Sequence, residues 1–318
     1  MENVSQGVAA ELSFLNGKDF LSSADFNQDE ILALLELASQ LKNGDRRIDL
    51  GNRVLGLIFT KASTRTRVSF QVAMARLGGQ TIDINPELTQ VGRGEPLIDT
   101  ARVLSRYCDA LAIRTFDQNE LIDYANWSSI PIINALTDLE HPCQALADFL
   151  TIQETFGELK GQTLGYIGDG NNVANSLMLC GALLGVNIRI STPKGFEPNP
   201  SVVEKARSLA MSGATLEISN NPSEIVRGAN AIYTDVWASM GQELEVVHRQ
   251  KAFSQFCINE EMLLGAEKDV LIMHCLPAHR GEEITTEVME GKNSRIFDQA
   301  ENRLHVQQAL LSALLGGL

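Results

Sequence analysis

The residues between Ser63 and Arg67 have the composition of an anion-binding site. They read STRTR, after an apolar run at Val54–Phe59 and before apolar residues with helical spacing. A strand, a polar loop and a helix N-terminus present free backbone N–H groups to an anion. Hydroxyl and guanidinium groups add donors that match phosphate oxygens. The alternative is an ordinary capped helix with solvated arginines, since Ser and Thr are common N-caps.

Two further segments each contain a histidine and a cysteine within three residues. HPCQ at 141–144 opens a predicted helix, and HCLP at 274–277 ends a strongly apolar strand. Histidine and glutamine side chains can donate to a carbonyl group or accept from an amide. In α/β proteins ligands bind at the carboxyl ends of strands. The alternatives are a boundary histidine with protein partners at His141 and a core cysteine at Cys275.

Asp235 follows another predicted strand and is followed by the small residues of the loop 238–241. An acid at a strand end, next to a flexible loop, suits the binding of a cationic group under a lid. An ordinary strand-to-helix turn is the alternative.

The segment GDGNNV at 168–173 resembles a dinucleotide-binding loop. Val173 occupies the third small position, and the next strand ends in STP at 191–193, without an acid to bind a ribose. The residues therefore disfavour a nicotinamide-dependent oxidoreductase, which stays as the alternative from another enzyme class.

Composition bounds the remaining functions. The chain has 318 residues, a formal net charge of −14 and 44% hydrophobic residues, enough for two cores and too acidic for a nucleic-acid binder. Its five cysteines are scattered without a CxxC pair, and neither His274 nor His279 has metal-site spacing, so we expect no disulfide, metal or cofactor. The N-terminus does not resemble a signal peptide, and the apolar run 177–186 is shorter than the ~20 residues that span a bilayer. We expect a cytoplasmic protein without membrane association.

Apolar β-branched runs alternate with helix-length segments, which predicts parallel sheets flanked by helices. Asn27 and Glu30 form a plausible capping pair and Gly44 a stop signal for the first clear helix. Helices are also predicted at 142–156, between two groups of strands, and at 301–314. The fold class is therefore α/β with two domains, and the predicted strands are 54–59, 81–85, 110–115, 131–135, 163–168, 187–191, 215–219, 231–234 and 270–274.

Five longer motifs stand in a specific order along the chain: STRTRVSF at 63–70, GRGEP at 92–96, HPCQALADFLTIQE at 141–154, DVWASMGQE at 235–243 and HCLPAHRGEE at 274–283. With these motifs the chain resembles the aspartate/ornithine carbamoyltransferase family over nearly its full length. The ornithine branch is favoured because the aspartate-specific HPLPR is replaced by HCLP at 274–277, and because QVGRGE at 90–95 has no lysine. The resemblance implies two α/β domains, with a final helix that crosses back to the first.

The resemblance also implies site residues. Residues 1–139 with 302–318 would bind carbamoyl phosphate, and residues 140–301 would bind ornithine. Gln90 would reach into a neighbouring subunit of a homotrimer. Arg65, Arg114, His141 and Cys275 are expected to be catalytic. The expected carbamoyl phosphate ligands are Ser63, Thr64, Arg65, Thr66, Gln90, Arg114, His141, Pro142, Cys143, Gln144, Cys275, Leu276 and Arg303, and the expected ornithine ligands are Asn172, Asp235, Ser239 and Met240.

The implied reaction is direct attack of the side-chain amine of ornithine on carbamoyl phosphate, giving citrulline for arginine biosynthesis. An amine of pKa near 10.4 is neutral in only about one molecule in 2,500 at pH 7, so selecting it costs about 4.6 kcal/mol. No protein nucleophile is required, because positioning and electrostatics suffice. Two alternatives to this function remain: a carbamoyltransferase with another amine acceptor (acetylornithine, putrescine or aspartate), and a non-catalytic binding subunit with the same fold.

Overall fold

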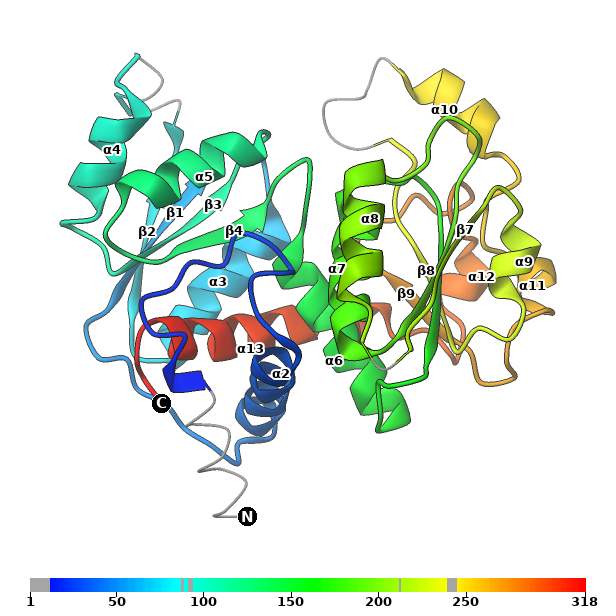
Figure 1. The fold of residues 1–318 in the computed structure, drawn as a ribbon, viewed down its shortest axis with the longest axis horizontal. Coiled ribbons are helices and arrows are strands. Elements are labelled where there is room, and N and C mark those ends of the chain that lie inside the picture. Colours follow the sequence, from blue (N-terminus) through cyan, green and yellow to red (C-terminus); the bar gives the residue numbers. More distant parts are fainter. Residues whose placement is uncertain (1–11, 87–88, 91–93, 212, 239–244) are drawn as a thin grey trace. The chain divides into compact units, whose positions relative to one another are not determined.

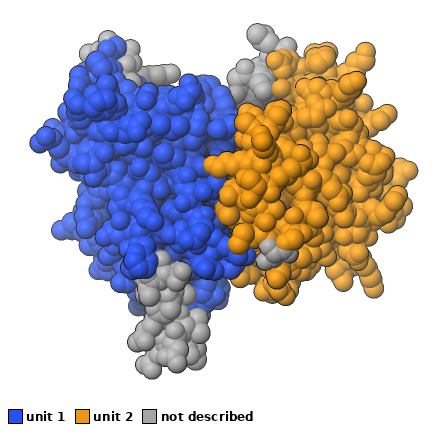
Figure 2. Space-filling view, viewed as in Figure 1, with its two compact units in different colours: residues 1–147, 302–318 blue, residues 148–301 orange. Residues whose placement is uncertain are grey.

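The structure is a computed structural model that describes residues 12–86, 89–90, 94–211, 213–238 and 245–318. The chain forms two compact units, one of residues 1–147 with 302–318 and one of residues 148–301 (Figure 1, Figure 2). We call them unit 1 and unit 2. Each unit contains one parallel sheet.

The sheet of unit 1 has the order β2-β1-β3-β4. From β1 the chain passes through α3 to one neighbour, whereas α4 and α5 lead in the opposite direction. Because such crossovers are right-handed, α3 covers one face of the sheet and α4 and α5 the other. The direction changes between β1 and β3, so the loops after these strands flank the crevice where ligands bind. The bounds are β1 (Val54–Phe59), α3 (Thr64–Arg76), β2 (Gln80–Ile84), α4 (Leu97–Leu104), β3 (Ala110–Arg114), α5 (Gln118–Trp127) and β4 (Ile132–Leu136).

Two further helices complete unit 1. α2 (Gln28–Asn43) begins at the predicted capping box, in which Asn27 and Glu30 exchange hydrogen bonds, and ends at Gly44 with φ +77°. The apolar side of α13 (Ile296–Leu314) is buried, and Lys42 of α2 donates to Asn302 of α13 at 2.8 Å. The C-terminal helix therefore packs on the first-domain helices, as the resemblance implied. It begins five residues before the predicted start at 301.

The sheet of unit 2 has the order β7-β6-β5-β8-β9. The chain turns back after β7, so the switch point lies between β5 and β8. Aromatic and aliphatic side chains around Phe253 and Ile272 fill one core of this unit. The bounds are α6 (Pro142–Phe156, which contains the boundary between the units), β5 (Thr163–Ile167), α7 (Asn172–Leu184), β6 (Asn187–Ser191), α8 (Pro200–Leu209), β7 (Leu216–Ser219), α9 (Pro222–Val226), β8 (Ala231–Thr234), α10 (Val246–Phe253), α11 (Glu260–Leu263), β9 (Leu271–His274) and α12 (Thr286–Met289).

The predicted α/β class is confirmed. All nine predicted strands are present, each within one residue of its predicted ends, and the helix at 142–156 has its predicted bounds. All five cysteines are free thiols. Among the described residues, no helix combines the length and apolar composition needed to cross a membrane.

Candidate active site

The STRTR segment follows β1 at the switch point of unit 1, where Ser63 precedes α3 and residues 64–67 form its first turn. Ser63 occupies the N-cap position of α3, but its side chain makes no capping hydrogen bond in the described structure. The Ser63 side chain is thus not a cap of this helix, whereas Arg65 in its first turn is exposed, as the alternative of solvated arginines requires. Thr66 is 2% exposed, and its hydroxyl accepts a hydrogen bond at 2.9 Å from Nη2 of Arg303.

Arg303 joins three segments that are distant in the sequence. Besides Thr66, its guanidinium reaches Nε2 of His141 at 3.1 Å and Oε1 of Gln144 at 2.9 Å. Arg303, His141 and Gln144 are each at most 5% exposed. Since an arginine can only donate, Nε2 of His141 accepts, and the proton of a neutral imidazole lies on Nδ1. The three predicted ligands are thus held together in one buried network.

Positive charge is concentrated in this part of unit 1. Burial, together with the nearby guanidinium groups of Arg303 and Arg65, lowers the pKa of Arg114 to about 10, against the opposing effect of Asp138. Burial, with Arg303 and Arg114, also holds the pKa of His141 well below its ordinary value. This unbalanced positive charge around Arg114 and His141 favours an anion as ligand. We call Arg65, Arg114, Arg303 and His141 the cationic cluster.

Lys61 is a cation of this region that the sequence analysis did not single out. Its ammonium pairs with Asp138 at 2.9 Å, lies 3.8 Å from the centre of the Phe116 ring, and is 8% exposed. The signal was present, since Lys61 lies between the end of β1 and the STRTR segment, two residues before Ser63. Its pairing with Asp138 places a further positive charge beside the loop.

The other predicted ligands of unit 1 differ in their surroundings. Gln90 is exposed, and its carbonyl accepts from the backbone N–H of Glu95 at 3.0 Å. Pro142 is the first residue of α6. Cys143 is fully buried, directs its thiol at the carbonyl of Asn134 at 3.5 Å, and has its pKa raised to about 12 by burial. A ligand role for the Cys143 side chain has no support from this geometry.

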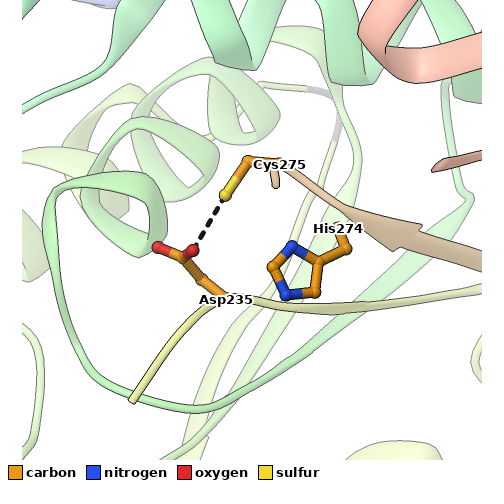
Figure 3. Close-up of side chains that lie close together, drawn as sticks. All are labelled: Asp235, His274 and Cys275. Carbon is orange, nitrogen blue, oxygen red and sulfur yellow. Dashed lines mark hydrogen bonds between the residues drawn. The ribbon is translucent and has the colours of Figure 1, made fainter. Parts of the chain in front are cut away.

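In unit 2 the predicted residues Asp235 and Cys275 meet at the ends of β8 and β9. The thiol of Cys275 donates to Oδ1 of Asp235 at 2.9 Å (Figure 3). Asp235 is 6% exposed and also accepts from Asn171 Nδ2 and from the backbone N–H of Val236, both at 2.8 Å. Burial, and then the charge of Asp235, raise the pKa of Cys275 well above its ordinary value. Cys275 is therefore a protonated thiol at neutral pH.

His274 holds its neighbours in place through both nitrogens of its ring. Its Nδ1 accepts from the backbone N–H of Leu276 at 2.9 Å, so its proton lies on Nε2, which donates to the buried Glu283 at 3.1 Å. Leu276 has φ +60°, a conformation that costs a branched residue free energy and is stabilised here by this contact. Asp235, His274 and Cys275 bring potential metal-ligand atoms within 4.8 Å of one another. Metal binding there would have to displace a hydrogen bond of His274.

The glycine-rich loop after β5 has a different use from that of a dinucleotide loop. A Cβ on Gly170 would lie 2.3 Å from the backbone nitrogen of Pro198, and the Gly170 N–H donates to Phe196 at 2.9 Å. The chain itself thus occupies the space that a pyrophosphate would need. Asn171 caps α7 and binds Asp235. The sequence analysis named its neighbour Asn172, the first residue of α7, and missed Asn171.

Arg249 was also missed. Its Nη1 binds Asp169 of the glycine-rich loop and the carbonyl of Trp237 beyond β8, both at 2.8 Å. Both side chains of the Arg249–Asp169 pair are nearly buried, at 8% and 11% exposed. Arg249 thereby ties together the two loops that carry Asn171 and Asp235. No motif pointed to it, because it lies on α10, well beyond the predicted loop. Ser239 and Met240, which the resemblance assigned to ornithine, lie outside the described residues.

The fold and these two groups of side chains define a two-unit α/β protein, in which one unit carries a cluster of arginines and the other a carboxylate–thiol pair. The chain belongs to the aspartate/ornithine carbamoyltransferase family. The family's carbamoyl-P binding domain matches residues 18–154, and its Asp/Orn binding domain matches residues 160–314.

Proteins similar to this chain are named ornithine carbamoyltransferases. The chain is 70% identical over 318 residues to an ornithine carbamoyltransferase of Parasynechococcus marenigrum, with all of both chains covered. It is 71% identical over 313 residues to one of Prochlorococcus marinus, with 98% of each covered. Among solved structures, the ornithine carbamoyltransferase of Pyrococcus furiosus matches with a TM-score of 0.92 at 47% identity, covering 96% of this chain and 99% of that one.

Proposed function

We propose that this chain transfers the carbamoyl group of carbamoyl phosphate to the side-chain amine of L-ornithine, giving L-citrulline and phosphate for arginine biosynthesis. The cationic cluster is the observation that carries the proposal. Arg303 and Arg65 lower the pKa of Arg114, and Arg303 and Arg114 lower that of the neutral His141, so positive charge gathers where a small, multiply charged anion would fit. The ornithine names of the similar proteins support this acceptor.

Unit 1 would bind the donor. The backbone N–H groups at the start of α3, the hydroxyls of Ser63 and Thr64, and the arginines would hold the phosphate. In the described structure Arg303 donates to Thr66, His141 and Gln144. These contacts keep the three side chains in place, so that His141 and Gln144 can receive the carbamoyl carbonyl and amide.

Unit 2 would bind the acceptor. Asp235 would take the α-ammonium group of ornithine, and Asn172 at the start of α7 its carboxylate. Cys275 is a neutral thiol, whose sulfur can accept a hydrogen bond from the side-chain amine without adding negative charge that would favour the ammonium form. Residues 239 and 240 are proposed to complete this site on the resemblance alone.

The chemical step needs no covalent enzyme intermediate. The neutral amine forms a C–N bond to the carbamoyl carbon, the C–O bond to phosphate breaks, and phosphate leaves with that electron pair. The nitrogen then loses its extra proton, for which the departing phosphate is a ready acceptor. Arg65 and Arg114 would stabilise the charge that grows on phosphate, where preorganised donors have their largest effect.

A citrulline assay with four acceptors tests the proposal. With carbamoyl phosphate as donor we expect kcat/KM for ornithine to exceed that for acetylornithine, putrescine and aspartate by about 100-fold or more, because a site that binds polar groups rejects analogues that leave them unpaired. If kcat/KM for one of the other three amines exceeds that for ornithine, that amine is the acceptor and ornithine is not. Fluorescence titration with a nicotinamide cofactor tests the oxidoreductase alternative, for which we expect no saturable signal.

The pH profile of kcat tests the neutral-amine step. The pKa of His141 is held well below its ordinary value and that of Cys275 well above, so neither group should titrate between pH 6 and 9. A rise of kcat over this range would then report deprotonation of ornithine, at up to about tenfold per pH unit. A flat profile contradicts the neutral-amine step.

We also propose a homotrimer in which Gln90 enters the site of a neighbouring subunit. The exposure of Gln90 is compatible with this role. The Gln90→Ala and Arg65→Ala enzymes, each expected to be weakly active, can be unfolded, mixed in equal amounts and refolded together. Random trimers should recover about a quarter of wild-type activity, since a site needs one intact residue from each of two subunits. No recovery would place Gln90 in the site of its own subunit or outside any site.

A further inference from the structure

The turn that follows HCLP carries a second cluster of potential ligands in unit 2. His279, Glu282 and Glu283 each offer a ligand atom, and these atoms lie within 4.8 Å of one another. The turn is closed by a hydrogen bond from the Glu282 N–H to the His279 carbonyl at 2.9 Å. All three residues are described, and none belongs to the proposed ornithine site.

In each carboxylate one oxygen is held by the protein. Oε1 of Glu282 accepts from Gln250 at 3.1 Å, while its Oε2 lies 3.9 Å from Nδ1 of His279. Oε1 of Glu283 accepts from the His279 N–H at 2.5 Å and from His274 Nε2 at 3.1 Å. These contacts orient the two carboxylates and leave Oε2 of each available.

The remaining oxygen of Glu283 is the second observation that points to a ligand. Glu283 is 0% exposed, and among the residues that the structure describes no donor lies within hydrogen-bond distance of its Oε2. A buried carboxylate oxygen without a partner is costly, and a bound cation is one of the ways in which proteins offset that cost.

The distances suit a transition metal. Zn²⁺ binds imidazole nitrogen and carboxylate oxygen at about 2.0–2.2 Å, so two of its ligands lie no more than about 4.3 Å apart. The 3.9 Å between His279 and Glu282 is too long for a hydrogen bond and within this limit. Both side chains are partly exposed, at 55% and 38%, and can rotate to close the rest of the cluster. An imidazole with two carboxylates favours Zn²⁺ or Co²⁺ over Mg²⁺ or Ca²⁺.

We propose that His279, Glu282 and Glu283 form a binding site for a divalent transition metal of the Zn²⁺ class, with water completing the coordination. Glu283 also accepts from His274, so the metal would brace the turn at 279–283 against the strand end that carries Cys275. This inference departs from the expectation that the protein has no metal site, which was drawn from the sequence spacing around His274 and His279. It does not rest on the proposed function.

The test uses the full chain with Cys275→Ser, which removes the thiol of the other ligand cluster, and with Zn²⁺ and Co²⁺ as probes. At Zn²⁺ about 100-fold above its Kd, we expect the Tm to rise by about 5 °C. Co²⁺ should give a ligand-field spectrum without a thiolate charge-transfer band. Adding His279→Asn or Glu282→Gln, both at partly exposed side chains, should weaken binding at least tenfold.

His248→Asn is the matched control, because His248 is another exposed histidine of unit 2 that lies outside the cluster. It should bind both metals as the Cys275→Ser parent does. Equal affinity in the His279→Asn variant, or equal loss in the His248→Asn variant, would overturn the proposal. So would a parent protein that shows neither a Tm shift nor a Co²⁺ spectrum.

Discussion

The two switch points of this molecule share a topology and differ in charge. In unit 1 the first turn of α3, which follows β1, carries Arg65, and the end of β3 carries Arg114, and both contribute to the cationic cluster. In unit 2 the loops after β5 and β8 carry Asn171 and Asp235, joined to the thiol at the end of β9. The scaffold thus places loops at the crevice, and the side chains decide which ligand is bound. One switch point suits an anion and the other an amino group.

The largest expected effect comes from removing a charge of the cationic cluster. Arg65→Ala should lower kcat/KM for carbamoyl phosphate by about 10²–10⁴-fold, or about 3–5 kcal/mol, because a charge-assisted contact to phosphate is lost both in binding and as charge develops. Steady-state citrulline kinetics measure it. Arg76→Ala, at the exposed C-terminal end of the same helix, is the matched control and should stay near wild type. A value within threefold of wild type for Arg65→Ala would mean that unit 1 does not bind the phosphate there.

Unit 2 has its own buried cation, but this one is structural. Arg249→Met leaves Asp169 nearly buried without its guanidinium partner and should lower the free energy of unfolding by about 3 kcal/mol. Burial already raises the pKa of Asp169, against the effect of Arg249, so protonation at low pH should reduce this loss. Urea unfolding at pH 7 and pH 5 measures both effects. KM for ornithine should rise, because Arg249 holds the backbone at Trp237.

The matched control is Glu245→Gln, which removes the exposed partner of the same arginine. Glu245 is 57% exposed, so this change should cost less than about 1 kcal/mol. The double variant Arg249→Met with Asp169→Asn should recover part of the lost stability, since no buried charge is then unpaired. If KM for ornithine is unchanged in every variant, Arg249 does not position the acceptor site.

Replacing the Cys275 thiol of unit 2 should have a smaller effect on activity, and the effect should concern one substrate only. Cys275→Ser should lower kcat/KM for ornithine by about 10–100-fold while changing the Kd of carbamoyl phosphate by less than about threefold, because a hydroxyl replaces the larger, softer sulfur. Cys257→Ser, a partly buried thiol elsewhere in unit 2, is the control. Equal losses toward both substrates would contradict the assignment of Cys275 to the acceptor.

Much of this arrangement was predictable from local patterns. The strands and the STRTR and HCLP segments could be predicted because apolar periodicity and strand ends depend on residues that are close together in the sequence. Contacts between distant segments have no such signal. The bond of Arg303 to Thr66 joins residues 237 positions apart, and Arg249 reaches Asp169 across 80 positions. Arg303 was predicted only from the family resemblance, and Arg249 and Asn171 were not predicted at all.

The smallest expected effect is the dependence of stability on His141. Its pKa in the folded protein lies well below the ordinary value of 6.5, so below that pH the unfolded chain binds a proton that the folded chain does not. Stability therefore falls as pH decreases from 6.5, with a slope of at most about 1.36 kcal/mol per pH unit for this group. His141→Gln, whose amide oxygen can still accept from Arg303, should lose that slope in urea unfolding between pH 7 and 5. His248→Gln, an exposed histidine of unit 2, should keep it. If wild type and His141→Gln show the same slope, His141 is not held neutral in the folded protein. The cationic cluster of unit 1 would then not contain a neutral histidine.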